Sequence, residues 1–396
     1  MRVAISIGGR FPSPFRLAEY LERQDCLARI ITTLPRYTLE PLALDPSHFV
    51  TAPWIGALNY GMRQVPLLRE RPERNYWTMR LFENAVVHHL DGCDLFNGWC
   101  SSALRSMRKA KSLGAVTVLN TGSVHIATQK QLLEDEYATF GQRRVVTDQR
   151  LVDQGVQEFA EADHIIVASS FVKRSLLDQG IPERKISMVP DAVTRLLQPA
   201  AKVDDIFRVI AVGRIEFRKG IQYLLRAFRE LRLPNAELLL VGGPQPEFTA
   251  LLDEYRGSYR LTGRVSDAEL ARWYNQSSVF VLPSVEDGWG HVTLEAMSSG
   301  LPVIVSANAG SADAVEHGKS GFVVPARDVE ALKATLLELY ENPELRRSMG
   351  AEAAAVARAR TWDEYGRQNL AVFRRVLGGQ RDIDASSEKE SLVTRA

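Results

Sequence analysis

Two cationic side chains stand close together in the segment GRIEFRKG, residues 213–220, which follows an apolar stretch with the pattern of a buried strand. Arg214 and Lys219 would therefore lie in a loop between a strand and a helix. Such a loop presents backbone N–H groups and the positive end of the helix dipole to an anion. Arginine can bind a diphosphate through two parallel hydrogen bonds, and lysine adds a point charge. The spacing predicts a diphosphate-binding loop; two solvated surface cations are the alternative interpretation.

Two carboxylates stand in a second segment, PSVEDGWGHVTLEAM (283–297), which again runs from an apolar strand into a helix. Asp287 precedes a glycine turn, and Glu295 lies eight residues later, inside the predicted helix. Gly288 and Gly290 would let the backbone approach a ligand closely. Ionised carboxylates are strong hydrogen-bond acceptors, so the pair suits the hydroxyl groups of a sugar or a ribose. Taken singly, Asp287 could equally be a helix cap and Glu295 a solvated side chain.

These two segments belong to an ordered series of motifs that covers the second half of the chain nearly end to end. The series consists of GRIEFRKG (213–220), LLLVGGPQPE (238–247), LTGRVSDAELARWYNQSSVFVLPS (261–284), DGWGHVTLEAMSSGLPVI (287–304), SGFVVP (320–325) and TWDEY (361–365). It resembles glycosyltransferase family 4, also called glycosyltransferases group 1, which consists of retaining nucleotide-sugar transferases of the GT-B architecture. In the first half the similarity is architectural and rests on Gly8-Gly9 and on FVKRSLLDQGIPERKISMVPDAV (171–193).

The resemblance implies an enzyme of the hexosyltransferase type that moves a sugar from a nucleotide diphosphate sugar to an acceptor hydroxyl with retention. The donor would be a UDP-, GDP- or ADP-sugar and the acceptor a saccharide or a lipid-linked molecule. No metal or cofactor would be needed. A role in bacterial polysaccharide or glycolipid synthesis follows by analogy of fold. A UDP-sugar 2-epimerase-like isomerase on the same scaffold and a non-catalytic nucleotide-sugar-binding protein are the alternatives.

The resemblance also gives expected roles to residues at matching positions. Arg214 and Lys219 would bind the donor diphosphate and stabilise the leaving group, which makes them catalytic. Asp287, also expected to be catalytic, would contact the donor sugar, and Glu295 would hydrogen-bond the ribose. The other expected donor contacts involve the backbone, at Gly8, Gly9, Gly263, Arg264, Val265, Gly290, His291 and Val292.

Two positions depart from the family pattern. Asp287 replaces the first glutamate of the E-x7-E pair, and Glu286 stands one residue earlier. Because aspartate is one methylene shorter, either the sugar lies deeper or Glu286 takes part of the role. The sequence PDAV (190–193) stands where the family has PNGV, and we assign no function to it.

A histidine in the first half is a further candidate. His125 follows the predicted strand 115–120, where many members of the family place a histidine that faces the donor sugar and the acceptor. It could hydrogen-bond the reacting sugar or position the acceptor hydroxyl, so we expect a catalytic role. The alternative is an ordinary loop histidine.

Short apolar runs alternate with longer amphipathic segments, which is typical of βαβ units and parallel sheets. Strands are expected at 3–7, 27–33, 48–52, 94–97, 115–120, 164–169, 208–212, 237–241, 279–282 and 302–306, and one helical segment at 129–157. The predicted fold is α/β, with two doubly wound Rossmann-like domains that face a cleft. An acceptor-side domain would span 1–196 and a nucleotide-sugar-binding domain 206–360. A helix at 361–377 would return to the first domain, before a disordered tail at 378–396.

The chain has 396 residues, 45% hydrophobic and 24% charged, which is enough for two domains with sizeable cores. Its net charge of +1 argues against a nucleic-acid partner. The chain has three cysteines without metal spacing and no apolar run long enough to span a bilayer, which favours a cytoplasmic protein. The D-x-D sequence at 382–384 is expected to hold no metal.

The stretch 62–80 could dock on anionic lipid at the inner face of a membrane, or it could be a solvated basic face. Its cations are Arg63, Arg69, Arg71, Arg74 and Arg80.

Overall fold

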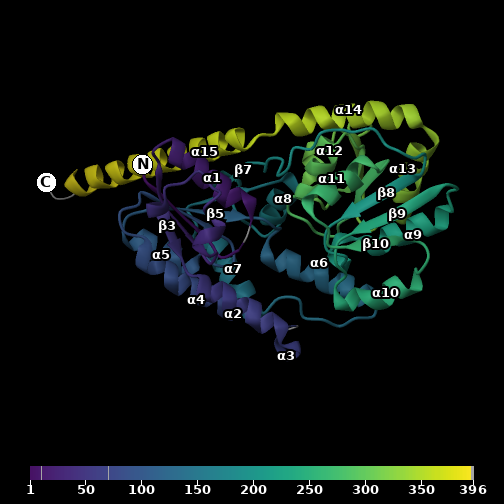
Figure 1. The fold of residues 1–396 in the computed structure, drawn as a ribbon. Coiled ribbons are helices and arrows are strands. Elements are labelled where there is room, and N and C mark those ends of the chain that lie inside the picture. The colour runs from purple at the N-terminus through teal and green to yellow at the C-terminus, as the bar shows by residue number, and fades with distance from the viewer. Residues whose placement is uncertain (10, 70, 394–396) are drawn as a thin grey trace.

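The N-terminal domain is built on a seven-stranded sheet in the order β3-β2-β1-β4-β5-β6-β7, in which all neighbours are parallel (Figure 1). The computed structural model describes residues 1–9, 11–69 and 71–393, without the side chains of Pro66, Arg69 and 380–393. The strands are β1 Val3–Ile7, β2 Leu27–Thr32, β3 Phe49–Thr51, β4 Leu95–Trp99, β5 Val116–Thr121, β6 His164–Val167 and β7 Ile186–Met188. The helices are α1 Pro12–Arg23, α2 Pro53–Gln64, α3 Pro66–Arg69, α4 Glu73–Val86, α5 Leu104–Ser112, α6 Ile126–Thr139, α7 Gln149–Glu161 and α8 Ser170–Asp178. Helices cover both faces of the sheet, so β1, β4 and β5 are buried along their whole length.

The C-terminal domain repeats this plan with a six-stranded parallel sheet in the order β10-β9-β8-β11-β12-β13. Its strands are β8 Phe207–Val212, β9 Ala236–Val241, β10 Arg260–Gly263, β11 Val279–Leu282, β12 Val303–Ser306 and β13 Gly321–Val324. Its helices are α9 Ile221–Leu231, α10 Thr249–Glu254, α11 Asp267–Asn275, α12 His291–Ser298, α13 Val329–Glu341 and α14 Pro343–Ala359. Along β8, Val209 and Ala211 enter one hydrophobic core and Ile210 enters the other, as expected of a strand covered on both faces. The predicted α/β class with two doubly wound domains is confirmed.

The sequence prediction missed three strands and one helix break. Strands β7, β10 and β13 were not predicted, and each lies at an edge of its sheet. The segment 129–157 does not form one helix: α6 ends at Thr139 and α7 begins at Gln149. Gly141, with φ of +71°, turns the chain between them.

The last helix, α15, spans Trp362–Val393 and runs from the C-terminal domain back along the N-terminal one (Figure 1). Tyr365 and Phe373 join the hydrophobic core that contains Leu17 of α1. Helix α1 approaches so closely that a Cβ at Gly366 would lie 2.2 Å from the ring of Tyr20. The structure continues α15 through residues 378–393, where a disordered tail was expected. Residues 394–396 lie outside the described part of the chain.

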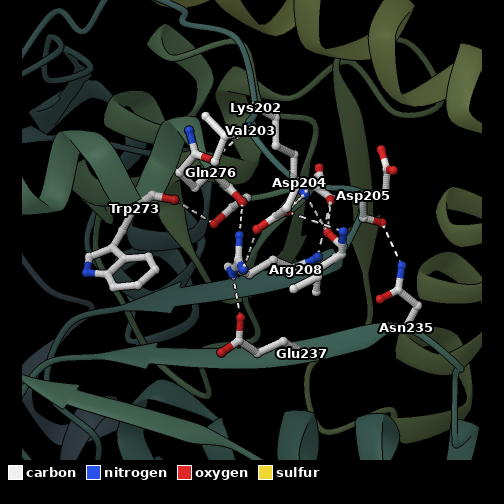
Figure 2. Close-up of polar contacts among 12 residues, drawn as sticks. Lys202, Val203, Asp204, Asp205, Arg208, Asn235, Glu237, Trp273 and Gln276 are labelled. Atoms are coloured by element: carbon white, nitrogen blue, oxygen red, sulfur yellow. Dashed lines mark hydrogen bonds and ion pairs between the residues drawn. The ribbon is translucent and has the colours of Figure 1, made fainter.

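The segment that connects the two domains is fixed to the C-terminal domain by Arg208, which is 4% exposed. Figure 2 shows its guanidinium among the residues of the linker and of the neighbouring strand. Arg208 donates from Nε to Glu237 at 2.5 Å, from Nη2 to Asp204 at 3.1 Å, and from Nη1 to the carbonyl of Gln276. Lys202 adds an ion pair with the same Asp204. The predicted linker 197–205 is therefore an ordered part of the second domain.

The chain passes between the domains twice, once before this linker and once before α15. The two passages lie side by side, because the N–H of Val193 donates to the carbonyl of Arg360 at 3.3 Å. Each domain is thus held to the other by two adjacent chain segments. In the described ranges, no helix is long and apolar enough to cross a membrane.

Candidate active site

A cavity of about 620 Å³ lies between the two domains. The N-terminal domain contributes Gly8, Gly9, Ser13, Asn59, Arg63, Trp99, Ser101, Asn120 and Asp191 to its wall, and the C-terminal domain contributes Arg214, Arg218, Asp287, Trp289, Gly290 and His291. Several of these residues follow β1, β4, β5, β8 and β11, so the carboxyl ends of both sheets point to the cavity. This is where doubly wound sheets bind their ligands.

The predicted diphosphate loop lies at the cavity, between β8 and α9. Arg214 is on the wall, and its side chain, 55% exposed, forms an ion pair with Glu216 at 3.1 Å. Gly220 ends the loop with φ of +69°, and a Cβ there would lie 1.8 Å from the carbonyl oxygen of Pro283. Only glycine lets this loop pack directly on the segment that carries Asp287.

Two consecutive cations of this loop pair with two consecutive acids. Lys219 forms an ion pair with Asp287, and Arg218 donates from Nε to Glu286 at 2.7 Å. Burial raises the pKa of Asp287, but the charges of Lys219 and Arg218 outweigh it and hold that pKa below its usual value. Burial lowers the pKa of Arg218, but Glu286, Asp287 and Glu216 together outweigh it and the pKa is raised. Asp287 and Arg218 are therefore charged at neutral pH.

Glu286 does not reach the cavity. Its side chain has no exposed surface, and its oxygens accept hydrogen bonds from Arg218, from the side chain of Gln129 at 2.9 Å, and from the N–H of Val124 at 3.3 Å. A carboxylate with three donors and no exposed surface is not free to bind a sugar. The expectation that Glu286 shares the donor-sugar role is therefore corrected.

The start of helix α12 and the turn before it lie at the cavity. Gly290 has φ of +83° and stands before the first residue of the helix, His291. Nε2 of His291 lies 3.2 Å from Asp191, and Nδ1 lies 3.2 Å from the hydroxyl of Thr194. Burial lowers the pKa of His291, but the hydrogen bond to Asp191 and the charges of Asp191, Asp287 and Glu295 together outweigh it, so the pKa is raised. Asp191 also accepts a hydrogen bond from Ser13 of the N-terminal domain at 2.8 Å. The contact between His291 and Asp191 therefore joins the two domains.

Besides Glu286, six expected donor-binding residues are not on the wall of this cavity: Lys219, Gly263, Arg264, Val265, Val292 and Glu295. Glu295 is 4% exposed and lies 3.6 Å from a guanidinium nitrogen of Arg195. Burial raises its pKa, and Arg195 opposes the rise only in part. The carbonyl of Val292 accepts a hydrogen bond from Tyr274 at 3.3 Å. The donor contacts expected of these six residues therefore remain predictions.

His125 is buried away from the cavity and forms the N-terminal cap of α6. Its ring accepts a hydrogen bond from the N–H of Ala127 at 3.3 Å and packs on Phe159, with 4.8 Å between ring centroids. Burial lowers its pKa, so the ring is neutral at pH 7. In this structure the side chain turns into the domain and caps α6, and the catalytic role expected from its position after β5 stays a prediction.

Sequence reasoning missed Arg218 and Asp191 as site residues. Arg218 stands beside Lys219 in the motif, yet nothing in its spacing reveals the buried partner that fixes it. Asp191 lies in the PDAV stretch to which no function was given, and its partner His291 is distant in sequence. Within residues whose side chains are described, no cluster of three or more His, Cys, Asp or Glu could hold a metal ion.

Residues 194–356, which make up most of the C-terminal domain, match the sequence model of the family described as "Glycosyl transferases group 1". A D-inositol 3-phosphate glycosyltransferase from Nocardioides sp. is 32% identical over 200 residues, which span 45% of this chain and 44% of that protein. The match thus covers less than half the length of this relative.

Solved structures extend the likeness to both domains. Sucrose-phosphate synthase from Thermosynechococcus elongatus has a TM-score of 0.74 at 21% identity, covering 96% of this chain and all of that one. HepE from Anabaena in complex with UDP-glucose has a TM-score of 0.67 at 16% identity, covering 94% of this chain and all of that one. The fold is the GT-B arrangement of two Rossmann-like domains.

Proposed function

We propose that this protein is a retaining glycosyltransferase that moves a sugar from a nucleotide diphosphate sugar to an acceptor hydroxyl. The observation that carries the proposal is the interdomain cavity, where Arg214, Arg218 and Asp287 meet the start of α12 opposite the backbone of Gly8 and Gly9. The family match of the C-terminal domain and the glycosyltransferase relative support it. The complex of HepE with UDP-glucose makes a UDP-sugar the first donor to test.

In the proposed mechanism the chain stabilises charge on the departing diphosphate. Arg214 and Lys219 bring positive charge to that group, and the N–H groups at the start of α12 add the helix dipole. Asp287 accepts hydrogen bonds from the sugar hydroxyls and fixes the reacting carbon. The acceptor enters from the N-terminal wall and attacks from the side of the leaving group, so the configuration is retained. Positioning and electrostatic stabilisation supply the catalysis, without a metal.

Calorimetry tests the donor site directly. We expect one of UDP, GDP and ADP, or a sugar conjugate of it, to bind at micromolar concentration, unchanged by EDTA. Lys219→Ala should abolish the binding. Lys333→Ala, which removes a lysine from an ion-paired cluster on α13 outside the cavity wall, is the matched control. Absence of binding to all of these compounds would reject the proposal.

Product analysis separates transfer from the other chemistries of this scaffold. With a saccharide acceptor, NMR of the product should show the anomeric configuration of the donor. A new nucleotide sugar formed without acceptor would indicate an isomerase. Donor binding with neither transfer nor hydrolysis would indicate a non-catalytic binding protein.

The acceptor-side helices suggest where the reaction takes place. Trp54 and Leu67 are 56% and 80% exposed, and Trp77 is 53% exposed, on α2, α3 and α4. Asn59 and Arg63, also on α2, line the cavity. Aromatic and cationic side chains together suit the headgroup region of an anionic membrane. We therefore propose that this face rests on the cytoplasmic surface of a membrane and that the acceptor is lipid-linked, in polysaccharide or glycolipid synthesis.

Vesicle flotation tests this contact. The protein should float with vesicles that contain phosphatidylglycerol and not with pure phosphatidylcholine, and Trp54→Ser with Leu67→Ser should reduce the bound fraction. Leu113→Ser, at an exposed leucine that ends α5, is the matched control. Equal binding by the double variant and the control would reject the membrane contact and leave the transferase proposal intact. The side chain of Arg69, one of the cations of the stretch 62–80, lies outside the described part of the chain.

A further inference from the structure

Helix α6 belongs to the N-terminal domain by sequence but packs on the C-terminal one at its far end. Tyr137 lies in the core of the C-terminal domain, with its ring centroid 5.3 Å from that of Phe217. Phe140, just beyond the helix, lies 5.0 Å from the same ring. Phe217 begins the short turn that carries Arg218 and Lys219. The aromatic residues at the C-terminal end of α6 thus pack against residues 213–220, called the cationic loop below.

A buried carboxylate fixes the same end of α6 to the start of α9. Glu136 has no exposed surface. It accepts hydrogen bonds from Gln222 and Tyr223, each at 2.7 Å, and from Arg327 at 2.6 Å. Gln222 also donates to the carbonyl of Phe217 at 2.9 Å. This contact therefore continues into the cationic loop.

The first turn of α6 reaches the loop by a different route. Gln129 donates to Oε2 of Glu286 at 2.9 Å, and Arg218 donates to the same oxygen at 2.7 Å. Val124, just before the helix, donates its N–H to Oε1. One buried carboxylate of the C-terminal domain thus joins two donors of the N-terminal domain to a guanidinium on the cavity wall.

We propose that Gln129 and Glu286 are positioning residues, which hold Arg218 and the adjoining Lys219 where the donor diphosphate binds. A buried carboxylate is stable only with its hydrogen bonds complete. If the N-terminal domain moved away, Glu286 would lose two of its three donors and its geometry with Arg218 would relax. The donor site is then complete only while α6 is docked. This inference rests on the function proposed above and adds a dependence of donor binding on the acceptor-side domain.

Gln129→Met is the first test, because methionine keeps the length of the side chain and removes the amide. We expect the KM for the donor to rise about tenfold, the value of one hydrogen bond to a charged group, with the acceptor KM and the thermal midpoint unchanged. In an Arg218→Met background the same substitution should have no further effect. Lys130→Met, which breaks the ion pair between Lys130 and Glu134 on the same helix, is the matched control and should leave the donor KM at the wild-type value.

Hydrogen exchange of the ligand-free protein gives a readout independent of activity. Residues 213–223 should exchange faster in Gln129→Met than in wild type or Lys130→Met. Unchanged donor KM and unchanged exchange in Gln129→Met would overturn the inference while the transferase proposal stands. If wild type bound no nucleotide, the transferase proposal would fall, and exchange alone would decide whether Gln129 orders the loop.

Discussion

Replacing Lys219 by alanine removes one partner of the ion pair between Lys219 and Asp287 in the proposed donor site. The side chains of Lys219 and Asp287 are 16% and 10% exposed, so the pair is largely buried. Removal of one member leaves the other charged without its partner, which costs about 3–5 kcal/mol of unfolding free energy. Arg218 also lowers the pKa of Asp287 and remains in the variant. We therefore expect the lower end of that range, about 3 kcal/mol at pH 7.

The pKa of Asp287 decides how this loss depends on pH. In wild type the pKa is below its unfolded value, so the carboxylate contributes stability above the unfolded pKa and loses it as pH falls through the folded pKa. Lys219→Ala removes one of the two cations that oppose the effect of burial, and only Arg218 remains. The pKa of Asp287 should therefore rise in this variant. The variant then relieves its unpaired charge by taking up a proton on acidification. The stability difference between variant and wild type should narrow as pH falls from 7 toward about 4.

Urea unfolding followed by tryptophan fluorescence at the two pH values measures this difference, and steady-state kinetics measures the site. We expect kcat/KM for the donor to fall by about 10²-fold or more, the usual effect of losing one charge-stabilising group. Lys333→Ala should change neither quantity. A stability difference that is equal at both pH values, or a kcat/KM within about threefold of wild type, would refute the reasoning.

Three further substitutions test other parts of the molecule. Arg208→Met leaves Glu237 and Asp204 without their shared cation, so unfolding free energy should fall by about 3 kcal/mol while kcat/KM at low temperature stays unchanged. His125→Ala removes a helix cap and should cost about 1–2 kcal/mol by urea unfolding; a large fall in kcat at unchanged stability would instead support its catalytic role. Burial raises the pKa of Glu83 to about 7, above the unfolded value, so its ionisation costs stability as pH rises through that range. Relative to Glu83→Gln, wild type should therefore lose about 3 kcal/mol between pH 5 and 8, and parallel pH profiles would contradict this.

The fold could be predicted from the sequence because the central strands are continuous apolar runs. Strand β1 is buried along its whole length and all its residues are apolar or small, and β8 follows this pattern except at Arg208, whose charge is paired. Strand β10, with the sequence RLTG, is only partly buried at an edge and has no such constraint. The break between α6 and α7 was missed because both helices are amphipathic and Gly141 alone marks the turn.

The candidate site was predictable only where chemistry and motif spacing coincide. Arg214 and Asp287 stand in loops after strands, and the topology alone brings them to the cavity. Arg218 and Asp191 depend on partners distant in sequence, which no local pattern reveals. The direction of the His125 side chain was not predictable either: its place after β5 is correct, but packing on Phe159 turns it into the domain.

The return of α15 to the first domain has a consequence for synthesis of the chain. The N-terminal domain leaves the ribosome first, yet its core includes Tyr365 and Phe373 from the last helix. The C-terminal domain, completed by α14, is contiguous and can fold as soon as residue 359 has emerged. The domain that is made first therefore completes its core last, after the second domain has already formed. Until then the face of α1 that packs on α15 stays uncovered, and a ribosome that stalls shortly after α14 would release a protein with one finished domain.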